Sequence, residues 1–345
     1  MNHLTVAIDA MGGDFGPRIT VPASLQALAS NPHLHILLVG DPHPILSLLS
    51  HTDNMLQKRL KIIGVDSIVP HHNTNKPILQ KKRSSSMRKT LEQVQIGKAC
   101  ACVSAGNTSE MVRLAKLLLK PLSGIQRPAL MTMLPNQQKR KTVFLDIGAN
   151  IHADTALLVQ FAVMGSIVAK DLLGISYPRV ALINIGTEIN KGSKSIQEAA
   201  KMLKKSISIN FVGYLEANDL LSGNTDVLIC DGFVGNITLK TMEGVLKMLL
   251  SNFQPLKTAK EKNWGHRLLT RFFHKYLTIK FSELHPDQYN GACLLGFHNT
   301  VIKSHGSANQ RAFIAAIQQA EQAVRQETPE RISACLKGVL LPKSD

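Results

Sequence analysis

One stretch constrains the fold of this chain more than any other: an apolar run that breaks at Asp231-Gly232 and then resumes with a different period. Residues 227–230 are short, aliphatic and bounded by polar residues, which is typical of a strand buried on both faces in a parallel sheet. After Gly235 the apolar residues recur with helical spacing as far as Leu250. The stretch therefore predicts a strand, a glycine turn and a helix.

Such a turn is a natural place for an anion. In open α/β sheets ligands lie beyond the carboxyl ends of the strands, where a helix start offers free N–H groups and a positive dipole end. Gly232 and Gly235 permit close approaches that a Cβ would forbid, while Asp231 and Asn236 either cap the helix or face a ligand. A single turn of this kind is equally well a simple capped connection.

Repetition favours the functional interpretation. Four more apolar runs end in glycine with Asp or Asn, at Asp9-Ala-Met-Gly12-Gly13-Asp14, Ser104-Ala-Gly106-Asn107-Thr108, Asp146-Ile-Gly148-Ala-Asn150 and Asn184-Ile-Gly186. Five such strand ends on one edge of a sheet would outline a binding site. The amides, hydroxyls and side-chain amide of residues 104–108 predict a cradle for a small oxyanion. Asp9 orients a ligand or caps a helix.

The overall composition describes a well-cored soluble protein. The chain has 345 residues, 44% of them hydrophobic, and a mean hydropathy of +0.01. This length predicts either one large α/β unit or two lobes. The sequence shows no run of 18 apolar residues and no signal peptide, so the expected location is the cytoplasm.

The charge balance predicts an acidic partner. Forty Lys and Arg against 24 Asp and Glu give a net charge of +16, which attracts nucleic acid, anionic lipid, phosphate or an acidic protein. Aromatic residues make up only 5% and do not alternate with the basic residues. This pattern argues against a nucleic-acid platform.

Several common kinds of site are excluded by their motifs. The five cysteines lack zinc-type spacing and read as reduced core residues, and the pair His71-His72 has no neighbouring ligands, so we predict no metal. Dinucleotide, P-loop, GxSxG and HExxH motifs are also missing from the sequence. We predict no cofactor, and a site that binds and polarises its substrates without supplying a covalent nucleophile. An acyl thioester on Cys230 is an alternative, which its place in a predicted buried strand disfavours.

Between Lys257 and Phe281 the chain changes character. An apolar stripe with helical spacing is surrounded by lysines and arginines, and its central members are Trp264, Leu268, Leu269, Phe272 and Phe273. This is a basic amphipathic helix, which either lies on an anionic membrane surface or packs at a dimer or core interface.

A family resemblance covers essentially the whole chain. It rests on these strings in order: Asp9-Ala-Met-Gly-Gly-Asp14, Ser84-Ser-Ser-Met87, Val103-Ser-Ala-Gly-Asn-Thr108, Asp146-Ile-Gly-Ala-Asn150, Gln160-Phe-Ala-Val-Met-Gly165, Asn184-Ile-Gly186, Lys191-Gly192, Cys230-Asp-Gly-Phe-Val-Gly-Asn236-Ile-Thr-Leu-Lys-Thr-Met-Glu-Gly244, Leu294-Leu-Gly296 and Lys303-Ser-His-Gly-Ser307. The chain thereby closely resembles the bacterial phosphate acyltransferases, the PlsX family.

The resemblance implies a fold and a reaction. The expected fold is a three-layer α/β/α unit over residues 1–345 with a mainly parallel sheet, similar to phosphate acetyltransferases and isocitrate or isopropylmalate dehydrogenases. Residues 250–285 are expected to protrude as the amphipathic segment. The implied activity moves a long-chain fatty acyl group from acyl carrier protein to inorganic phosphate. A homodimer would make acyl phosphate for a downstream glycerol-3-phosphate acyltransferase in phospholipid synthesis, in the cytoplasm or peripherally on the membrane.

The resemblance also suggests roles for residues. Lys191 and Asn236 match family positions tied to catalysis, and His305 is a candidate acid for the leaving thiol or a core histidine. The expected binding residues are Asp9, Gly12, Gly13, Ser104, Gly106, Asn107, Thr108, Asp146, Asn150, Gly186, Asp231, Gly232 and Gly235. Acyl carrier protein, which is acidic, would dock on Lys81, Lys82, Arg83, Arg88 and Lys89.

The chain departs from the family pattern at a few positions. Ser109-Glu110 replaces Gly-Ala after the Gly-Asn-Thr string, Asn290 replaces the first glycine of a pair, and Ser84 replaces an acidic residue. These differences bear on rate and substrate preference.

Three rival functions remain open at this point. The chain could be a phosphate acetyl- or butyryltransferase that uses coenzyme A, or a dehydrogenase of related fold, although no adenosine-binding motif supports the latter. From another class, it could be a membrane-associated scaffold in which Glu110 spoils the phosphate loop.

Overall fold

The computed structural model describes residues 4–50, 52–65, 85–252 and 290–340. The strands are β1 (Leu4–Asp9), β2 (Leu34–Gly40), β3 (Leu60–Gly64), β4 (Ala101–Ser104), β5 (Ala129–Pro135), β6 (Lys141–Leu145), β7 (Arg179–Ile183), β8 (Asn210–Leu215), β9 (Val227–Ile229), β10 (Ala292–Leu295) and β11 (Thr300–Lys303). The helices are α1 (Pro17–Ser30), α2 (Pro42–Leu49), α3 (Asn54–Gln57), α5 (Ser86–Gln95), α6 (Thr108–Leu118), α7 (Thr155–Leu173), α8 (Lys194–Lys205), the short 3-10 helix η2 (Ala217–Asp219), α9 (Gly232–Asn252), α11 (Gln310–Arg325) and α12 (Thr328–Leu340).

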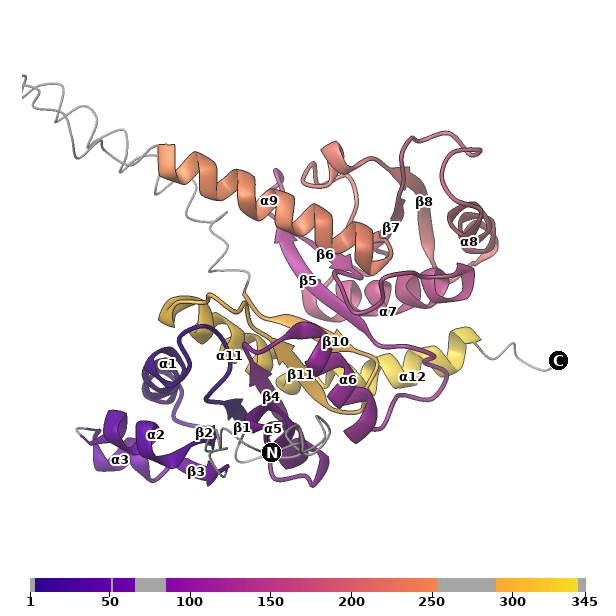
Figure 1. Ribbon diagram of the computed structural model, residues 1–345. Helices are drawn as coiled ribbons and strands as arrows, with labels where there is room; N and C mark the ends of the chain where they lie inside the picture. Colours follow the sequence, from indigo (N-terminus) through magenta and orange to yellow (C-terminus); the bar gives the residue numbers. More distant parts are fainter. Residues whose placement is uncertain (1–3, 51, 66–84, 253–289, 341–345) are drawn as a thin grey trace, which may run out of the picture.

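The strands form one sheet in the order β3-β2-β1-β4-β11-β10-β5-β6-β9-β7-β8. Seven of its ten pairings are parallel, and the three antiparallel ones lie together in the middle, where β10 and β5 join β11 to β6. Figure 1 shows two lobes connected by β5. The first lobe contains β1–β4 and β11, and the second contains β6–β9.

Helices cover both faces of the sheet. The buried side chains of α1, α7, α8 and α11 pack on one face, together with Val6 and Ile8 of β1. Those of α5 and α6 pack on the other face, together with Ala7, and α9 lies on this side with Leu239 and Met242 partly buried. The expected three-layer α/β/α fold with a mainly parallel sheet is confirmed.

The prediction that five strand ends share one edge of the sheet is wrong. Three successive antiparallel pairings reverse the strand direction between the lobes. The carboxyl ends of β1 and β4 therefore lie at the opposite edge from those of β6, β7 and β9. The helix α9, which begins at the second edge, bridges the two groups.

A further helix follows α11 at the end of the described chain. Residues 328–340 form α12, which packs against α7 and α11. Ile332 is buried in the core, and this burial orders a segment that the sequence left without a strong pattern.

One described helix, α7, is long and apolar enough to cross a membrane by composition. Most of it is buried between β6, β9, α8 and α12, so its apolar surface is used inside this fold.

An ion pair fixes the start of two neighbouring strands of the second lobe. Arg179, at the start of β7, donates from Nε and a terminal nitrogen to the two carboxylate oxygens of Asp226, each at 2.9 Å. Burial works to raise the pKa of Asp226, but the hydrogen bonds from Arg179 outweigh it and hold that pKa below its usual value.

We expect Asp226→Asn to reduce the free energy of unfolding by about 1–2 kcal/mol at pH 7, the lower range for charged hydrogen bonds because the guanidinium is partly exposed. A carboxylate with a depressed pKa stabilises the fold fully above its unfolded pKa of about 3.9 and loses that contribution as the pH falls. Urea unfolding of native chain and variant should differ by a constant amount from pH 7 to about pH 5 and converge as the pH falls further. A gap that closes between pH 7 and pH 5 would contradict this account.

Candidate active site

The start of α9 packs directly on the turn that follows β6. The Gly232 N–H donates to the Asn150 carbonyl at 2.7 Å, and a Cβ on Gly235 would lie 1.9 Å from the Asp146 carbonyl oxygen. Only glycine fits at residue 235, because any side chain would force the helix off the turn. This close approach fixes Asn236, one residue later, relative to the second lobe.

Asp146 and Asn150 hold that turn together. The buried Asp146 carboxylate accepts hydrogen bonds from the backbone N–H groups of Leu130, Gly148, Ala149 and Asn150 and from the Asn150 side chain, at 2.7 to 3.2 Å. Burial raises the pKa of Asp146, and these donors act against the rise. Its bonds are thus all made within the protein, which gives Asp146 and Asn150 a supporting role.

Asp231 acts as the cap of α9, since its side chain accepts from the Val234 N–H at 2.8 Å. The Asn236 side chain is exposed on the first turn of the same helix. A Cβ on Gly148 would lie 3.7 Å from the Asn236 Cβ. Asn236 therefore stands over the β6 turn with its amide open to a ligand.

Lys191 lies on the loop after β7, the strand next to β9. Asn184 ties the two ends of this loop, because it donates to the Lys191 carbonyl at 3.0 Å and accepts from the Ile185 N–H. The Lys191 side chain passes over Gly186, where a Cβ would lie 3.2 Å from its Cγ. Among the described residues, no hydrogen bond or ion pair engages its ammonium, which is free to meet an anion.

In the first lobe, the ends of β1 and β4 meet. The Ser104 hydroxyl donates to Asp9 Oδ2 at 2.6 Å and accepts from the Gly106 N–H at 3.0 Å. A Cβ on Gly12 would lie 2.7 Å from the same Asp9 oxygen. Asp9 is buried, and that burial raises its pKa.

The remaining cradle residues have mixed roles. The Asn107 side chain caps α6 by accepting from the Glu110 N–H at 3.0 Å, and Thr108 is the first residue of that helix. Gly13 packs against the Gly306 backbone, where a Cβ would approach the Gly306 carbonyl to 2.8 Å. The loops after β1, β4 and β11 thus form one group.

His305, in the loop after β11, meets α9 of the second lobe. Its Nε2 lies 2.9 Å from Lys240 Nζ and 3.6 Å from Glu243 Oε2, and its Nδ1 accepts from the Ser307 N–H. Burial works to raise the pKa of Glu243, but hydrogen bonds from His305 and Lys240 outweigh it and lower that pKa. These contacts form the interlobe junction, composed of Lys240, Glu243 and His305.

The junction joins the two groups of predicted residues. Asn236 and Lys240 are one helical turn apart on α9, so the helix carries the site from the second lobe to the first. The group around Asp9 and Ser104 and the group around Lys191 and Asn236 therefore flank the same helix, although the structure shows no direct contact between them in its described part.

A sequence model described as "Fatty acid synthesis protein" matches residues 4–331. The chain belongs to this fatty acid synthesis protein family. The match covers nearly the whole chain and confirms the resemblance to the PlsX phosphate acyltransferases. The chain is thus a phosphate acyltransferase that moves a fatty acyl group from acyl carrier protein to phosphate, and not the dehydrogenase considered above.

Solved structures of similar fold agree with this assignment. A phosphotransacetylase from Streptococcus pyogenes matches with a TM-score of 0.63 and 17% identity, covering 94% of each chain. The EutD phosphotransacetylase from Staphylococcus aureus has a TM-score of 0.57 and 17% identity, covering 92% of this chain and 94% of its own. A branched-chain phosphotransacylase from Enterococcus faecalis V583 has a TM-score of 0.57 and 14% identity, covering 93% and 99%. At these identities the likeness concerns the fold, as expected from the sequence.

Three residues near the predicted ones were not themselves predicted as site residues: Lys240, Glu243 and Lys303. Lys240 and Glu243 follow Asn236 at helical spacing, and Lys303 is a charged residue that ends an apolar strand two residues before His305. Both signals were present in the sequence.

The structure gives Cys230 no catalytic character. Its thiol is buried and lies 3.5 Å from the Asp146 carbonyl oxygen, and burial together with the nearby Asp146 charge raises its pKa well above the usual value. A thiol in this state is a poor nucleophile. Within the described ranges, no cluster of His, Cys, Asp and Glu could hold a metal ion.

Two of the predicted docking residues lie in the described part of the chain, whereas the predicted membrane residues do not. Arg88 forms a 2.9 Å ion pair with Glu92 on α5, and Lys89 is half-buried beside it. Lys81, Lys82, Arg83 and the loop with His71 lie outside the described residues, as do Trp264, Leu268, Leu269, Phe272 and Phe273.

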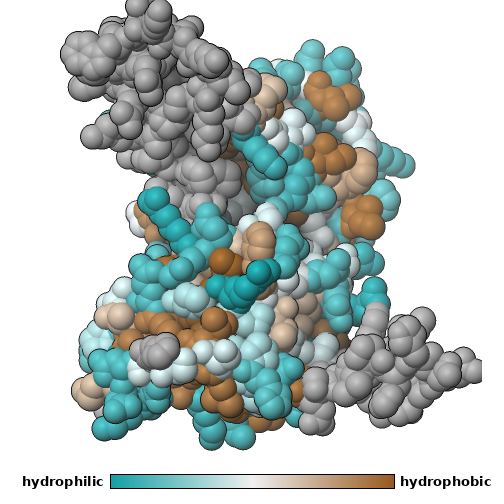
Figure 2. All heavy atoms as spheres, turned by 60° about the vertical axis from the view of Figure 1, so that its left-hand side comes forward, coloured by the Kyte–Doolittle hydropathy of each residue, from teal (hydrophilic) through white to brown (hydrophobic). Residues whose placement is uncertain are grey.

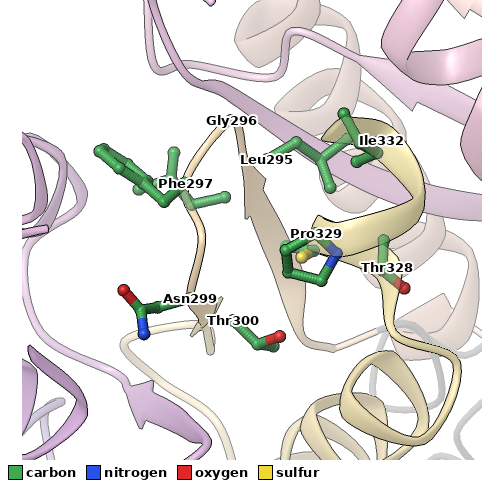
Figure 3. A pocket seen from close by; sticks show the side chains of 10 residues that line it. Leu295, Gly296, Phe297, Asn299, Thr300, Thr328, Pro329 and Ile332 are labelled. Carbon is green, nitrogen blue, oxygen red and sulfur yellow. The ribbon is translucent and has the colours of Figure 1, made fainter. Parts of the chain in front are cut away.

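The small cavities of the described residues do not coincide with the site. Figure 3 shows one of about 10 Å³ between β10 and α12, lined by Leu295, Phe297, Pro329 and Ile332 among others. This volume holds at most one water molecule.

Proposed function

We propose that this phosphate acyltransferase works by direct attack of hydrogen phosphate on the thioester in a ternary complex. The observation that carries the proposal is that the described residues of the site offer cations and polar donors but no activated nucleophile. Cys230 is buried with a raised pKa, and the Ser104 hydroxyl donates a hydrogen bond to Asp9. Phosphate is itself a competent nucleophile, so positioning and charge stabilisation suffice.

Each lobe supplies part of this positioning. Lys191 and Asn236 stabilise the developing oxyanion or the phosphate from the second lobe. The group of Asp9, Gly12, Gly13, Ser104 and Gly106 forms the phosphate cradle of the first lobe. Lys240 at the interlobe junction adds positive charge between them.

Initial-rate kinetics test the ternary complex. With acyl carrier protein thioester and phosphate both varied, double-reciprocal lines should intersect, because both substrates must be bound before transfer. Parallel lines together with acyl mass retained on the denatured protein would indicate a ping-pong route through an acyl-enzyme and would refute the proposal.

The loop that carries Lys191 also presents exposed apolar side chains. Ile185 is 80% exposed and Ile189 is 74% exposed, although both are large and aliphatic. Figure 2 shows apolar side chains standing out among hydrophilic ones on both lobes. Beside a catalytic lysine, such side chains fit the fatty chain of the substrate.

We expect Ile185→Asp and Ile189→Asp each to lower kcat/KM for a palmitoyl thioester of acyl carrier protein by about tenfold, the loss of one partly buried aliphatic contact. The same variants should treat a butyryl thioester as the native chain does. Ile207→Asp is the matched control, because Ile207 is also exposed but follows α8, away from Lys191. Equal losses for both chain lengths would contradict the assignment of this surface to the acyl chain.

The oligomeric state is part of the proposal. The family resemblance implies a homodimer, and α9 displays two exposed apolar residues, Ile237 and Val245, that a second copy could cover. Light scattering should give the mass of two chains at micromolar concentration. A mass of one chain would refute the prediction of a dimer.

Contact with the membrane is proposed from the sequence, since α9 leads directly into residues 253–289. A peripheral, cytoplasmic enzyme on anionic lipid would deliver acyl phosphate to the downstream glycerol-3-phosphate acyltransferase. The double variant Leu268→Glu with Phe272→Glu should abolish flotation with liposomes that contain anionic lipid. Unchanged flotation would remove the membrane role.

A further inference from the structure

Three polar side chains form a row across the carboxyl ends of adjacent parallel strands. Ser104 of β4 is the register partner of Lys303 of β11, and Ser104 is hydrogen-bonded to Asp9 at the end of β1. Two residues earlier on each strand, Ala7, Cys102 and Val301 are buried on the same face. The row therefore places a lysine and a carboxyl group on a surface that is otherwise apolar.

Lys303 is unusual because it is buried without a carboxylate partner. The residue is only 9% exposed, and its ammonium donates to the Ser304 carbonyl. The described residues provide it with no ion pair. Burial and the charge of Lys240 on α9 lower the pKa of Lys303 to about 8, against the opposing effects of Asp9 and Asp14. Burying an ammonium group costs free energy, and the pKa of this group lies near that of a thiol.

Asp9, another member of the row, can accept a further hydrogen bond. Asp9 Oδ2 accepts from Ser104, whereas the buried Oδ1 makes no hydrogen bond to any residue that the structure describes. The Ser86 hydroxyl and the Met11 and Gly12 amides lie near this carboxyl group, but none of them reaches Oδ1 with hydrogen-bond geometry. An acceptor of this kind fits the hydroxyl of a bound hydrogen phosphate.

The row lies where a carrier-bound thioester would arrive. The helix α5 packs on β1, and its first residue, Ser86, lies near Asp9. Arg88 and Lys89 follow on the same turn, within the basic cluster expected to dock acyl carrier protein. A carrier bound there would extend its thioester over the ends of β1, β4 and β11.

We propose that Lys303 is the proton donor to the leaving thiolate and that Asp9 accepts the proton of hydrogen phosphate. The proposal rests on the ternary mechanism proposed above. A phosphate oxygen forms a bond to the thioester carbon, and the carbon–sulfur bond breaks with its electron pair on sulfur. The Lys303 ammonium then gives a proton to that sulfur.

The proton balance of this step closes without a further reactant. Hydrogen phosphate dianion and a thioester become acyl phosphate dianion and a thiol. The proton that leaves phosphate through Asp9 returns to the neutral amine of Lys303. Ser104 lies between the two groups, since it is hydrogen-bonded to Asp9 and is the register partner of Lys303, and the charge of Asp9 acts to raise the pKa of the lysine.

His305 is less suited to this task. Its Nδ1 accepts from the Ser307 N–H and is thereby engaged within its own loop. Nε2 faces Glu243 and Lys240 at the interlobe junction, 3.6 and 2.9 Å away. The ring thus serves to link the lobes.

The test compares leaving groups. Native chain, Lys303→Met and Lys303→Arg are assayed for acyl phosphate with two palmitoyl donors, an N-acetylcysteamine thioester and a thionitrobenzoate thioester. The alkyl thiolate needs a proton and the aryl thiolate does not. Both variants should lose about 100-fold or more in kcat with the alkyl donor and less than about tenfold with the aryl donor. Arginine keeps the charge but does not release a proton at neutral pH.

The ratio of the two rates within one variant is independent of the fraction of folded protein, so misfolding does not imitate the result. Lys240→Met serves as a control that removes a neighbouring charge, and it should lower both rates alike. Equal losses with both donors in the Lys303 variants would overturn Lys303 as the proton donor. If the native chain forms acyl phosphate from neither these donors nor acyl carrier protein, the proposed function itself fails.

Discussion

Lys191→Met should lower the rate of acyl phosphate formation by about 100- to 1,000-fold, the usual cost of removing one charge or donor from an oxyanion site. The loss follows from the free ammonium of Lys191, which the Asn184-tied loop holds beside Gly186. Because the side chain is exposed and forms no bonds within the described structure, its removal should leave the unfolding midpoint unchanged.

Asn236→Ala should give a loss of similar size with the same unchanged stability, since the amide is exposed on the first turn of α9. Lys194→Met is the matched control, because Lys194 is an exposed lysine three residues beyond Lys191 at the start of α8. It should keep nearly full activity. A native rate in Lys191→Met, or a loss in Lys194→Met as large as in Lys191→Met, would remove Lys191 from the catalytic centre.

Gly235→Ala should destabilise the protein by about 3 kcal/mol or more, the upper range for overpacking. Its Cβ would lie 1.9 Å from the Asp146 carbonyl oxygen and 3.0 Å from the Cys230 sulfur, within rigid backbone and a buried strand end. The helix α9 would have to shift, which would also displace Asn236. Urea unfolding should show a lower midpoint, and activity should fall even where the variant is folded.

Gly244→Ala is the matched control on the same helix. No atom of the described residues lies within 4 Å of a Cβ at Gly244, so the alanine should stabilise the protein by roughly 0.5–1 kcal/mol through its better helix propensity. If Gly235→Ala were as stable as Gly244→Ala, the contact between α9 and the β6 turn would be wrong.

The strand, turn and helix at residues 226–252 could be predicted because its signals are local. The apolar run, the two glycines and the helical spacing all lie within 25 residues, and the structure places β9 and α9 there. Asp231 is the helix cap by the same local logic.

The direction of the strands could not be predicted in this way. It depends on β10, which pairs with β5 although some 160 residues separate them in the chain. Together with the β10–β11 and β5–β6 pairings, this pairing reverses the strand direction in the second lobe. Strand ends that were predicted to share one edge of the sheet therefore lie at opposite edges. No periodicity within either strand reports its partner.

The sequence also could not show which polar residues support a turn and which remain free for a substrate. Asp146 and Asn236 both follow apolar strands, but the first accepts hydrogen bonds from its own turn whereas the second stands on the surface. The importance of Lys303 arises from its neighbours on β1 and β4. Sequence patterns identify residues near the ends of strands, and only packing decides which remain free for a substrate.

The central claim is that phosphate attacks the thioester directly at this site, and the mass of the protein during turnover tests it most directly. Palmitoyl acyl carrier protein and phosphate labelled with ¹⁸O at every oxygen are incubated with the native chain, and the product and the intact protein are weighed by mass spectrometry. The account predicts acyl phosphate that retains all the label and a protein of unchanged mass. A protein that gains one palmitoyl group during turnover, or the failure to form any acyl phosphate, would contradict it.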